Sequence, residues 1–296
     1  MRENGRVTSA TRRPETPAST VPPRLIATDL DGTLLRDDKS VSERTIAALA
    51  AAEQAGIEVF FVTGRPARWM DVVSDHVHGH GLAICGNGAA VVDLHGGPGA
   101  HRFVKVRELA RENALDAVRL VREAAPGAVF AVEQTYGFYQ EPTYPKLHME
   151  TPDSLAPAEK LLAADAPGAG EPVLKILAFH HELDPDAFLT VARLAIGDRA
   201  NVTRSSPSAL LEISGPDVSK ASTLALCCAE RGISPEEVVA FGDMPNDVEM
   251  LSWAGQSYAM GNAHPEVIAA ASGRTVANNE DGVAVVIERI LAERLH

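Results

Sequence analysis

The chain has 296 residues, which is enough for about two domains of ordinary size. Lysine and arginine total 27 against 40 aspartates and glutamates, so the formal net charge is −13. Such an acidic chain repels nucleic-acid phosphates and anionic lipids, so we expect neither a nucleic-acid nor a membrane partner. No apolar run approaches the roughly 20 residues that span a bilayer.

Cysteine usage and the first residues of the chain both bear on where the protein works. Cys85, Cys227 and Cys228 form no Cys-x-x-Cys pair and lie in apolar segments. This usage is typical of a reducing compartment and points away from a disulfide framework or a zinc site, so we expect a cytoplasmic protein. Residues 1–22 contain almost nothing apolar and are predicted to form a disordered tail rather than a secretory signal.

From about residue 24 the sequence alternates between strand and helix patterns. The predicted elements are a strand 25–28, a helix that Ser42 caps and Gly56 ends, a strand 57–62, a further helical stretch and a strand 82–85. Parallel strands need a crossover connection, and strands buried on both faces are uniformly apolar. The pattern therefore predicts a doubly wound, mostly parallel α/β (Rossmann-like) core.

The middle third of the chain has a different order of elements. The predicted elements are a helix 108–125, strands 129–133 and 136–140, a short helix near Leu161, a strand 173–179, a helix 186–196 and a strand around Val202. This mixed order predicts an α+β domain with an antiparallel sheet.

After residue 205 the strand–helix alternation returns. The predicted elements are strands 210–213, 238–241 and 255–260 and helices 219–231 and 283–295. We therefore expect residues 23–87 and 205–296 to form one core, with residues 88–204 inserted as an α+β cap.

Four aspartates follow predicted strands of the core. Asp29 and Asp31 come after strand 25–28, and Asp243 and Asp247 come after strand 238–241. Ligands of doubly wound sheets bind beyond the carboxyl ends of the strands, and acids gathered there need a cation or a shared proton. The four acids therefore predict Mg²⁺ binding or acid–base chemistry. An Asx-rich turn would explain one or two of them but not the set.

Two further segments predict an anion site. Thr63, Gly64 and Arg65 follow strand 57–62, where a glycine allows close backbone approach and a threonine adds a hydroxyl, although ordinary turns also look like this. Lys220 stands at the head of helix 219–231, where the helix dipole disfavours a cation unless an anion lies in front of it. The alternative is a solvated lysine.

Three weaker candidates remain. His76, His78 and His80 alternate in a predicted loop, which favours a solvated loop over a metal site. Lys175 lies in an apolar strand and is equally compatible with a substrate contact and with an edge lysine. The segment 278–281 predicts a turn and helix cap with at most an indirect role at the site.

The motifs Asp29-Leu30-Asp31-Gly32-Thr33, Thr63-Gly64-Arg65, Lys220 and Gly242-Asp243-Met244-Pro245-Asn246-Asp247 resemble, in order, the four motifs of the haloacid dehalogenase superfamily. The stretches 259–265 and 279–283, together with Asn87-Gly88-Ala89, are similar to the Cof-like phosphatases of subfamily IIB. Ala221 stands where the family often has glycine.

The resemblance implies a role for each matching residue. Asp29 would be the nucleophile, forming an aspartyl-phosphate, and also a Mg²⁺ ligand. Asp31 would be the general acid/base and would ligate the metal through its main-chain carbonyl. The remaining implied roles are completion of the Mg²⁺ site by Asp243, ligation through water or orientation by Asp247, and phosphoryl binding by Thr63, Gly64, Lys220 and Asn246.

The expected function is a Mg²⁺-dependent phosphatase acting on a small phosphorylated metabolite. A dehalogenase needs no acid for its halide leaving group, whereas an ester oxygen does, so Asp31 favours a phosphatase. The resemblance favours a sugar phosphate as substrate, and the cap would close over the site. A phosphosugar mutase and a non-catalytic sugar-phosphate-binding regulator remain alternatives, and the oligomeric state is open.

Overall fold

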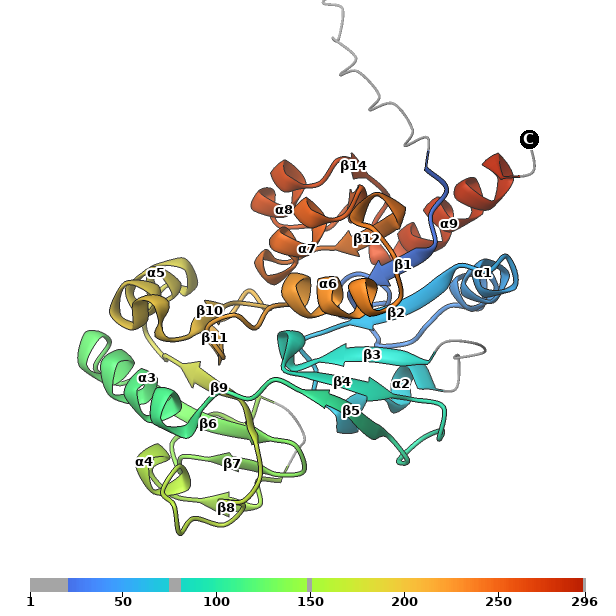
Figure 1. Cartoon of the computed structure of the whole chain (residues 1–296). Helices are drawn as coiled ribbons and strands as arrows, with labels where there is room; N and C mark the ends of the chain where they lie inside the picture. The colour runs from blue at the N-terminus through green and yellow to red at the C-terminus, as the bar shows by residue number, and fades with distance from the viewer. Residues whose placement is uncertain (1–20, 75–80, 148–150, 295–296) are drawn as a thin grey trace, which may run out of the picture.

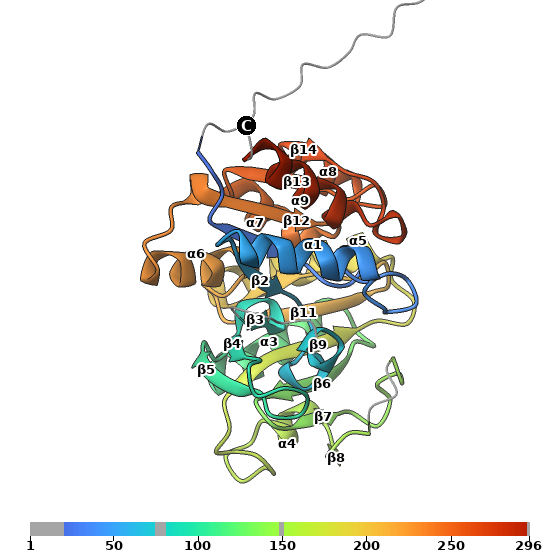
Figure 2. The same cartoon turned by 90° about the vertical axis from the view of Figure 1, so that its right-hand side faces the viewer.

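A computed structural model describes residues 21–74, 81–147 and 151–294 of the chain. These residues form two bodies, each built on its own β-sheet, which lie side by side in Figures 1 and 2. Nearly all of the predicted tail, 1–22, and the histidines at positions 76, 78 and 80 lie outside the described residues. None of the described helices is both long and apolar enough to cross a membrane.

The larger body, the core, contains an eight-stranded sheet in the order β14-β13-β12-β1-β2-β3-β4-β5. The pairs from β14 to β3 are parallel, and β4 and β5 extend that edge as antiparallel strands. The strand bounds are β1 Leu25–Thr28, β2 Glu58–Val62, β3 Leu82–Cys85, β4 Ala90–Asp93, β5 Arg102–Val106, β12 Val238–Gly242, β13 Gln256–Ala259 and β14 Gly273–Arg274.

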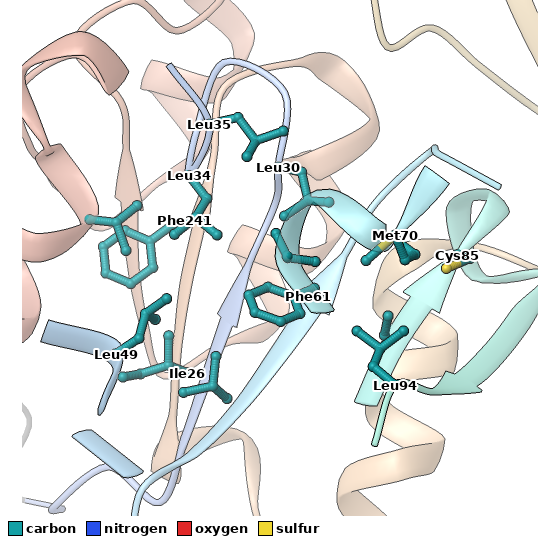
Figure 3. Close-up of a cluster of buried hydrophobic side chains, with 14 of the residues drawn as sticks. Ile26, Leu30, Leu34, Leu35, Leu49, Phe61, Met70, Cys85, Leu94 and Phe241 are labelled. Carbon is teal, nitrogen blue, oxygen red and sulfur yellow. The ribbon is translucent and has the colours of Figure 1, made fainter. Parts of the chain in front are cut away.

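Helices cover both faces of the core sheet. Alternate residues of a strand face opposite sides, so β1 buries Ile26 on one face and Leu25 and Ala27 on the other. Figure 3 shows the first face, where Leu49 of α1 lies with Ile26, Phe61 and Phe241. The helices on this face are α1 Glu43–Gln54, α2 Asp71–Ser74 and α9 Gly282–Glu293. Those on the opposite face are α6 Lys220–Glu230, α7 Val248–Trp253 and α8 Pro265–Ala270. Burial on both faces is why the central strands β1, β3 and β12 consist almost entirely of apolar residues.

The smaller body, the cap, contains a six-stranded sheet in the order β10-β11-β9-β6-β7-β8. Its strands are β6 Val129–Gln134, β7 Phe138–Gln140, β8 Ser154–Leu155, β9 Val173–Phe179, β10 Asn201–Thr203 and β11 Leu210–Ser214. One face packs against the helices α3 Arg111–Ala124, α4 Ala158–Leu161 and α5 Pro185–Ile196. All of its pairs except β7–β8 are antiparallel, as predicted for an α+β domain.

The opposite face of the cap sheet carries a smaller apolar cluster and three buried charged residues. Glu133 pairs with Lys175 across β6 and β9, and Glu212 pairs with Leu177 across β11 and β9. Residues two apart on a strand share a face, so Lys175 and Glu212 lie on the same side of the sheet. That side is turned toward the core, because Lys175 donates a hydrogen bond to the carbonyl of Gly64.

The predicted domain boundaries, 88–204 for the cap, are wrong at both ends. The strands β4 and β5 belong to the core sheet, where they form an antiparallel extension that the strand–helix rhythm did not predict. At the other end β11 belongs to the cap sheet, paired antiparallel with β9. Its apolar residues match a parallel core strand because it too is covered on both faces. The cap therefore occupies about residues 107–214.

Other elements follow the predictions with small shifts in their bounds. The strand 173–179 has the predicted bounds, and Ser42 and Ser219 cap their helices as expected for serine. The predicted strand 136–140 is shorter, since it begins at residue 138. Short elements such as α7, α8 and β14 were not predicted, because a few residues carry too little periodicity.

The corrected boundary predicts which cap deletion leaves a folded core. The two linkers are adjacent, because Arg107 donates to the main-chain carbonyl of Asp217 at 2.7 Å. Replacing residues 107–214 with a short Gly-Ser linker should leave a core that unfolds cooperatively on heating. Deleting 88–204 removes the core strands β4 and β5 and leaves β11 without the cap sheet that it belongs to. This second variant should therefore show no cooperative transition by circular dichroism. Similar melting of both deletions would contradict this boundary.

Candidate active site

The candidate active site lies where the strand order of the core reverses. The chain runs from β1 to β2 and β3 on one side, and from β12 to β13 and β14 on the other. Asp29 directly follows β1, Thr63 follows β2, and Asp243 follows β12. Ligands of doubly wound sheets bind at such a switch point because neighbouring connections leave in opposite directions and open a crevice.

Three of the four predicted aspartates meet at this point. Asp29, Asp243 and Asp247 each offer a carboxylate oxygen within 4.8 Å of the others. All three are buried, with exposed fractions of 5%, 6% and 0%. Taking three like charges out of water is costly unless cations compensate them.

Lys220 supplies one of those compensating charges. Lys220 is 1% exposed, and its ammonium donates hydrogen bonds to Asp29 Oδ1 at 2.6 Å and Asp247 Oδ1 at 2.7 Å. Burial alone would lower the pKa of Lys220, but the two carboxylates outweigh it and raise that pKa above its ordinary value. Lys220 is the first residue of α6, so its position opposite the helix dipole is explained by the anions that it faces.

Asp247 is held by the backbone of its own loop. Its Oδ2 accepts from the amides of Asp243 and Met244, both at 3.0 Å, while its Oδ1 accepts from Lys220. Both oxygens therefore already have donors. This arrangement fits the predicted orienting role better than direct metal ligation.

The remaining oxygens fit a hard divalent cation. Burial, together with the neighbouring carboxylates, raises the pKa of Asp29 to about 7 and that of Asp243 to about 8. Space for the cluster depends on Gly32, which has φ of 80° and whose added Cβ would stand 2.2 Å from Asp243 Oδ2. Carboxylate oxygens are the ligands that Mg²⁺ prefers. The residues present therefore fit Mg²⁺, with Asp29 and Asp243 as the side chains that would hold it.

Asp31 lies apart from this trio. Its carboxylate accepts from Arg65 Nε at 2.5 Å and Nη2 at 2.7 Å, and from Lys39 Nζ at 2.8 Å. Partial burial would raise the pKa of Asp31, but the hydrogen bonds and charges of Arg65 and Lys39 outweigh it and lower that pKa to about 2. Because β1 ends at Thr28, strand alternation does not extend to Asp31 and does not fix the side of its carboxylate.

The predicted phosphoryl-binding residues lie on two loops around the trio. The Thr63 hydroxyl accepts from the amide of Arg65 at 3.1 Å, which tightens the turn through Gly64. Asn246, in the 3-10 helix Pro245–Asp247, donates to Asn87 Oδ1 at 3.0 Å. Its own Oδ1 is buried without a hydrogen-bond partner among the described residues. Both loops therefore lie at the sheet edge that holds the aspartates.

Two asparagines from the C-terminal part of the core hold the loop that follows Asp29. Asn262 donates to the carbonyl of Gly32 at 2.8 Å and accepts from the amide of Asn278 at 3.1 Å. Asn278 in turn donates to the carbonyl of Leu35 at 3.0 Å. Asn278 therefore helps to hold the loop that follows Asp29, and an indirect role of segment 278–281 at the site stays a prediction.

Sequence reasoning missed several residues at the site. The clearest are Lys39 and Arg65 on Asp31, and Asn87 and Glu212 beside Gly64. Arg65 lies in the predicted anion-binding segment and Asn87 in a stretch that carries the family resemblance, but the sequence predicts no role for either side chain. No sequence signal could have placed Glu212, because it comes from the cap.

The raised carboxylate pKa values predict how the metal-free protein responds to pH. Since the folded-state pKa of Asp29 and Asp243 exceeds the ordinary value, the folded state binds more protons and loses stability as pH rises from about 4 to about 8. In chelator, Tm should fall across this range. Mg²⁺ should raise Tm more at pH 8 than at pH 6, because its ligands must be deprotonated.

The Asp243→Asn variant is the control for this prediction, since it removes one titrating ligand. Its Tm in chelator should depend less on pH, and Mg²⁺ should no longer raise it. An equal Mg²⁺ effect in wild type and variant would remove Asp243 from the metal site.

Comparison with known proteins agrees with this geometry. The family model of the haloacid dehalogenase-like hydrolases matches residues 26–287. A protein of Bacillus subtilis (strain 168) named 5-amino-6-(5-phospho-D-ribitylamino)uracil phosphatase YitU is 28% identical over 271 residues, which cover 88% of this chain and 95% of the relative.

Solved structures share the fold over nearly the whole chain. SMU.1108c from Streptococcus mutans UA159 aligns with a TM-score of 0.77 at 24% identity, covering 91% of this chain and 99% of that one. The subclass IIB sugar phosphatase BT4131 aligns with a TM-score of 0.72 at 21% identity, covering 90% and 98%. The chain belongs to the haloacid dehalogenase-like hydrolases.

Proposed function

We propose that the protein is a Mg²⁺-dependent phosphatase that hydrolyses a small sugar phosphate through an aspartyl-phosphate on Asp29. The observation that carries this proposal is the buried Asp29 carboxylate, held by Lys220 beside Asp243 and Asp247 at the switch point of the sheet. YitU is named for a phosphate ester on a ribityl chain, and BT4131 is named a sugar phosphatase. Both names support a polyhydroxylated leaving group.

Asp29 is the proposed nucleophile. One carboxylate oxygen forms a bond to phosphorus while the bond between phosphorus and the ester oxygen breaks, and water later hydrolyses the resulting acyl phosphate. Lys220 already donates to Oδ1 of Asp29, so it fixes the orientation of the carboxylate and adds positive charge where phosphoryl oxygens would gather. Thr63, Gly64 and Asn246 are the proposed further contacts to those oxygens.

The proposed metal ligands are the carboxylates of Asp29 and Asp243 and the main-chain carbonyl of Asp31. Asp247 is the proposed residue that orients them. When bound, Mg²⁺ would offset negative charge on the phosphoryl group and on the carboxylates around it. That charge matters because Lys220 neutralises only one of the three buried acids.

Asp31 is the proposed general acid and base. It would protonate the departing alkoxide and then take a proton from the attacking water. The ion pairs with Arg65 and Lys39 hold the carboxylate ionised in this structure, so Asp31 must leave them to carry a proton. We propose that the dianionic phosphate ester draws these two cations to itself and thereby releases Asp31.

The proposed setting is the cytoplasm, with a small phosphorylated metabolite as the partner. Cys85, Cys227 and Cys228 are free and buried, which is consistent with a reducing compartment.

Replacing the nucleophile should abolish turnover while the fold persists. Asp29→Asn keeps the shape of the side chain but cannot form the acyl phosphate, so we expect phosphate release to fall by at least about 10³-fold. The assay is phosphate release from sugar phosphates, nucleotides, flavin mononucleotide and pyridoxal phosphate, each with Mg²⁺ and with chelator. Release that persists in the variant, or in chelator, would contradict the proposal.

Removing the general acid should affect phosphorylation of Asp29 and its dephosphorylation differently, and substrates with different leaving groups can distinguish the two effects. With p-nitrophenyl phosphate, whose leaving group needs no acid, Asp31→Asn should show a burst of p-nitrophenol followed by slow turnover, because only dephosphorylation lacks its base. With a sugar phosphate the first step should itself slow by about 10²–10⁴-fold. If the variant turns over both substrates more slowly by the same factor and shows no burst, the general acid and base role of Asp31 is contradicted.

A further inference from the structure

A chain of buried polar contacts connects the cap to the candidate active site. Lys175 of β9 and Glu212 of β11 are 3% and 5% exposed, and they form an ion pair with Nζ and Oε1 3.2 Å apart. Ser205 also donates to Glu212 Oε1, at 3.0 Å. Both strands lie on the side of the cap nearer the core in Figures 1 and 2.

Each member of the pair reaches a different loop of the core. Lys175 Nζ donates to the main-chain carbonyl of Gly64 at 2.6 Å. Glu212 Oε2 accepts from Nδ2 of Asn87, which is 2% exposed. Asn87 Oδ1 accepts from Asn246 at 3.0 Å. One chain of contacts therefore touches both loops proposed to hold the phosphoryl group.

The approach is close enough to depend on a glycine. A Cβ added at Gly64 would lie 3.2 Å from Glu212 Oε2 and 3.2 Å from Asn87 Oδ1. With a Cβ these contacts would be tighter than ordinary side-chain packing, so the lack of a side chain at Gly64 allows the Glu212 carboxylate to lie close to the turn. Because burying charges costs free energy that apolar residues would not cost, stability alone gives little reason for an ion pair here.

We propose that Lys175 and Glu212 are positioning residues for phosphoryl transfer. They couple the seating of the cap to the placement of the Gly64 turn and, through Asn87, of Asn246. The inference rests on the proposed function, since it assigns these loops to the phosphoryl group. Misplacement of a substrate-positioning group by about 1 Å can cost about 10²-fold in rate.

A second contact between the bodies makes the inference testable. Arg68 pairs with Glu133 of β6, with Nη2 3.1 Å from Oε2. Replacing Lys175 or Glu212 removes neither member of this pair, so we expect it still to hold the cap against the core. Single variants should therefore keep the cap seated while the two loops lose their supports.

The experiment compares Lys175→Met, Glu212→Leu and the double variant, in which no charge of this pair is left buried alone. With p-nitrophenyl phosphate, each single variant should lower kcat by about 10- to 100-fold and weaken inhibition by inorganic phosphate. The double variant should be no worse than the poorer single one, because the residues act as one unit. Lys175→Arg, which can still donate to both partners, should recover most of kcat.

Hydrogen exchange supplies a readout that does not depend on turnover. The amides of segments 63–65 and 243–247 should exchange faster in both single variants, whereas those of α3 and α5 should not change. Matched controls are Lys160→Met and Glu182→Gln, two exposed residues of the cap, which should behave as wild type.

Three results would overturn the inference. The first is single variants with a lower Tm but unchanged kcat and unchanged inhibition by phosphate. The second is a double variant whose loss of kcat is the product of the two single losses. The third is unchanged amide hydrogen exchange in segments 63–65 and 243–247. If the wild type shows no Mg²⁺-dependent turnover at all, the proposed function fails instead, and the exchange measurement still decides whether Lys175 and Glu212 position the loops.

Discussion

The interaction on which the site depends is that of Lys220 with two carboxylates from different loops. Asp29 comes from the end of β1 and Asp247 from the loop after β12, and one ammonium holds both. Without it, three buried carboxylates would repel one another and either take up protons or move apart. The parallel register of β1 and β12 brings the two loops to the same edge. Lys220 then converts that proximity into a fixed geometry, in which a divalent cation and a phosphate dianion can balance each other's charge.

A second constraint is that the surroundings shift the pKa values of the site's aspartates in opposite directions. Burial raises the pKa of Asp29 and Asp243, whereas Arg65 and Lys39 lower that of Asp31. Asp29 and Asp31, close together in sequence, thus have opposite electrostatic environments, which suits the separate roles proposed for them as nucleophile and as proton carrier. The same logic extends to the cap, whose Lys175–Glu212 pair reaches the turn that carries Arg65.

The fold was predictable where one periodicity dominates a long enough stretch. The strand–helix alternation of β1 to β3 and the amphipathic helices α3 and α5 were expected, because burial on both faces or on one stripe leaves a direct mark on the residues. The domain boundary was not, because β4, β5 and β11 are ordinary apolar strands whose sheet is chosen by pairing partners far away in the chain. A strand's own residues do not say which sheet it joins.

The site divides in the same way. Motif spacing and the rule for parallel sheets were enough to place six residues at strand and helix ends: Asp29, Asp243, Asp247, Thr63, Gly64 and Lys220. The pairing of Asp31 with Arg65 and Lys39 could be seen only in the folded chain. The same is true of the contacts from Lys175 to Gly64 and from Glu212 to Asn87. This difference arises because the position of the backbone follows from the local sequence pattern. The partner of a buried charged side chain, in contrast, depends on which groups are desolvated together with it. Those groups are brought together only when the core and the cap pack against each other.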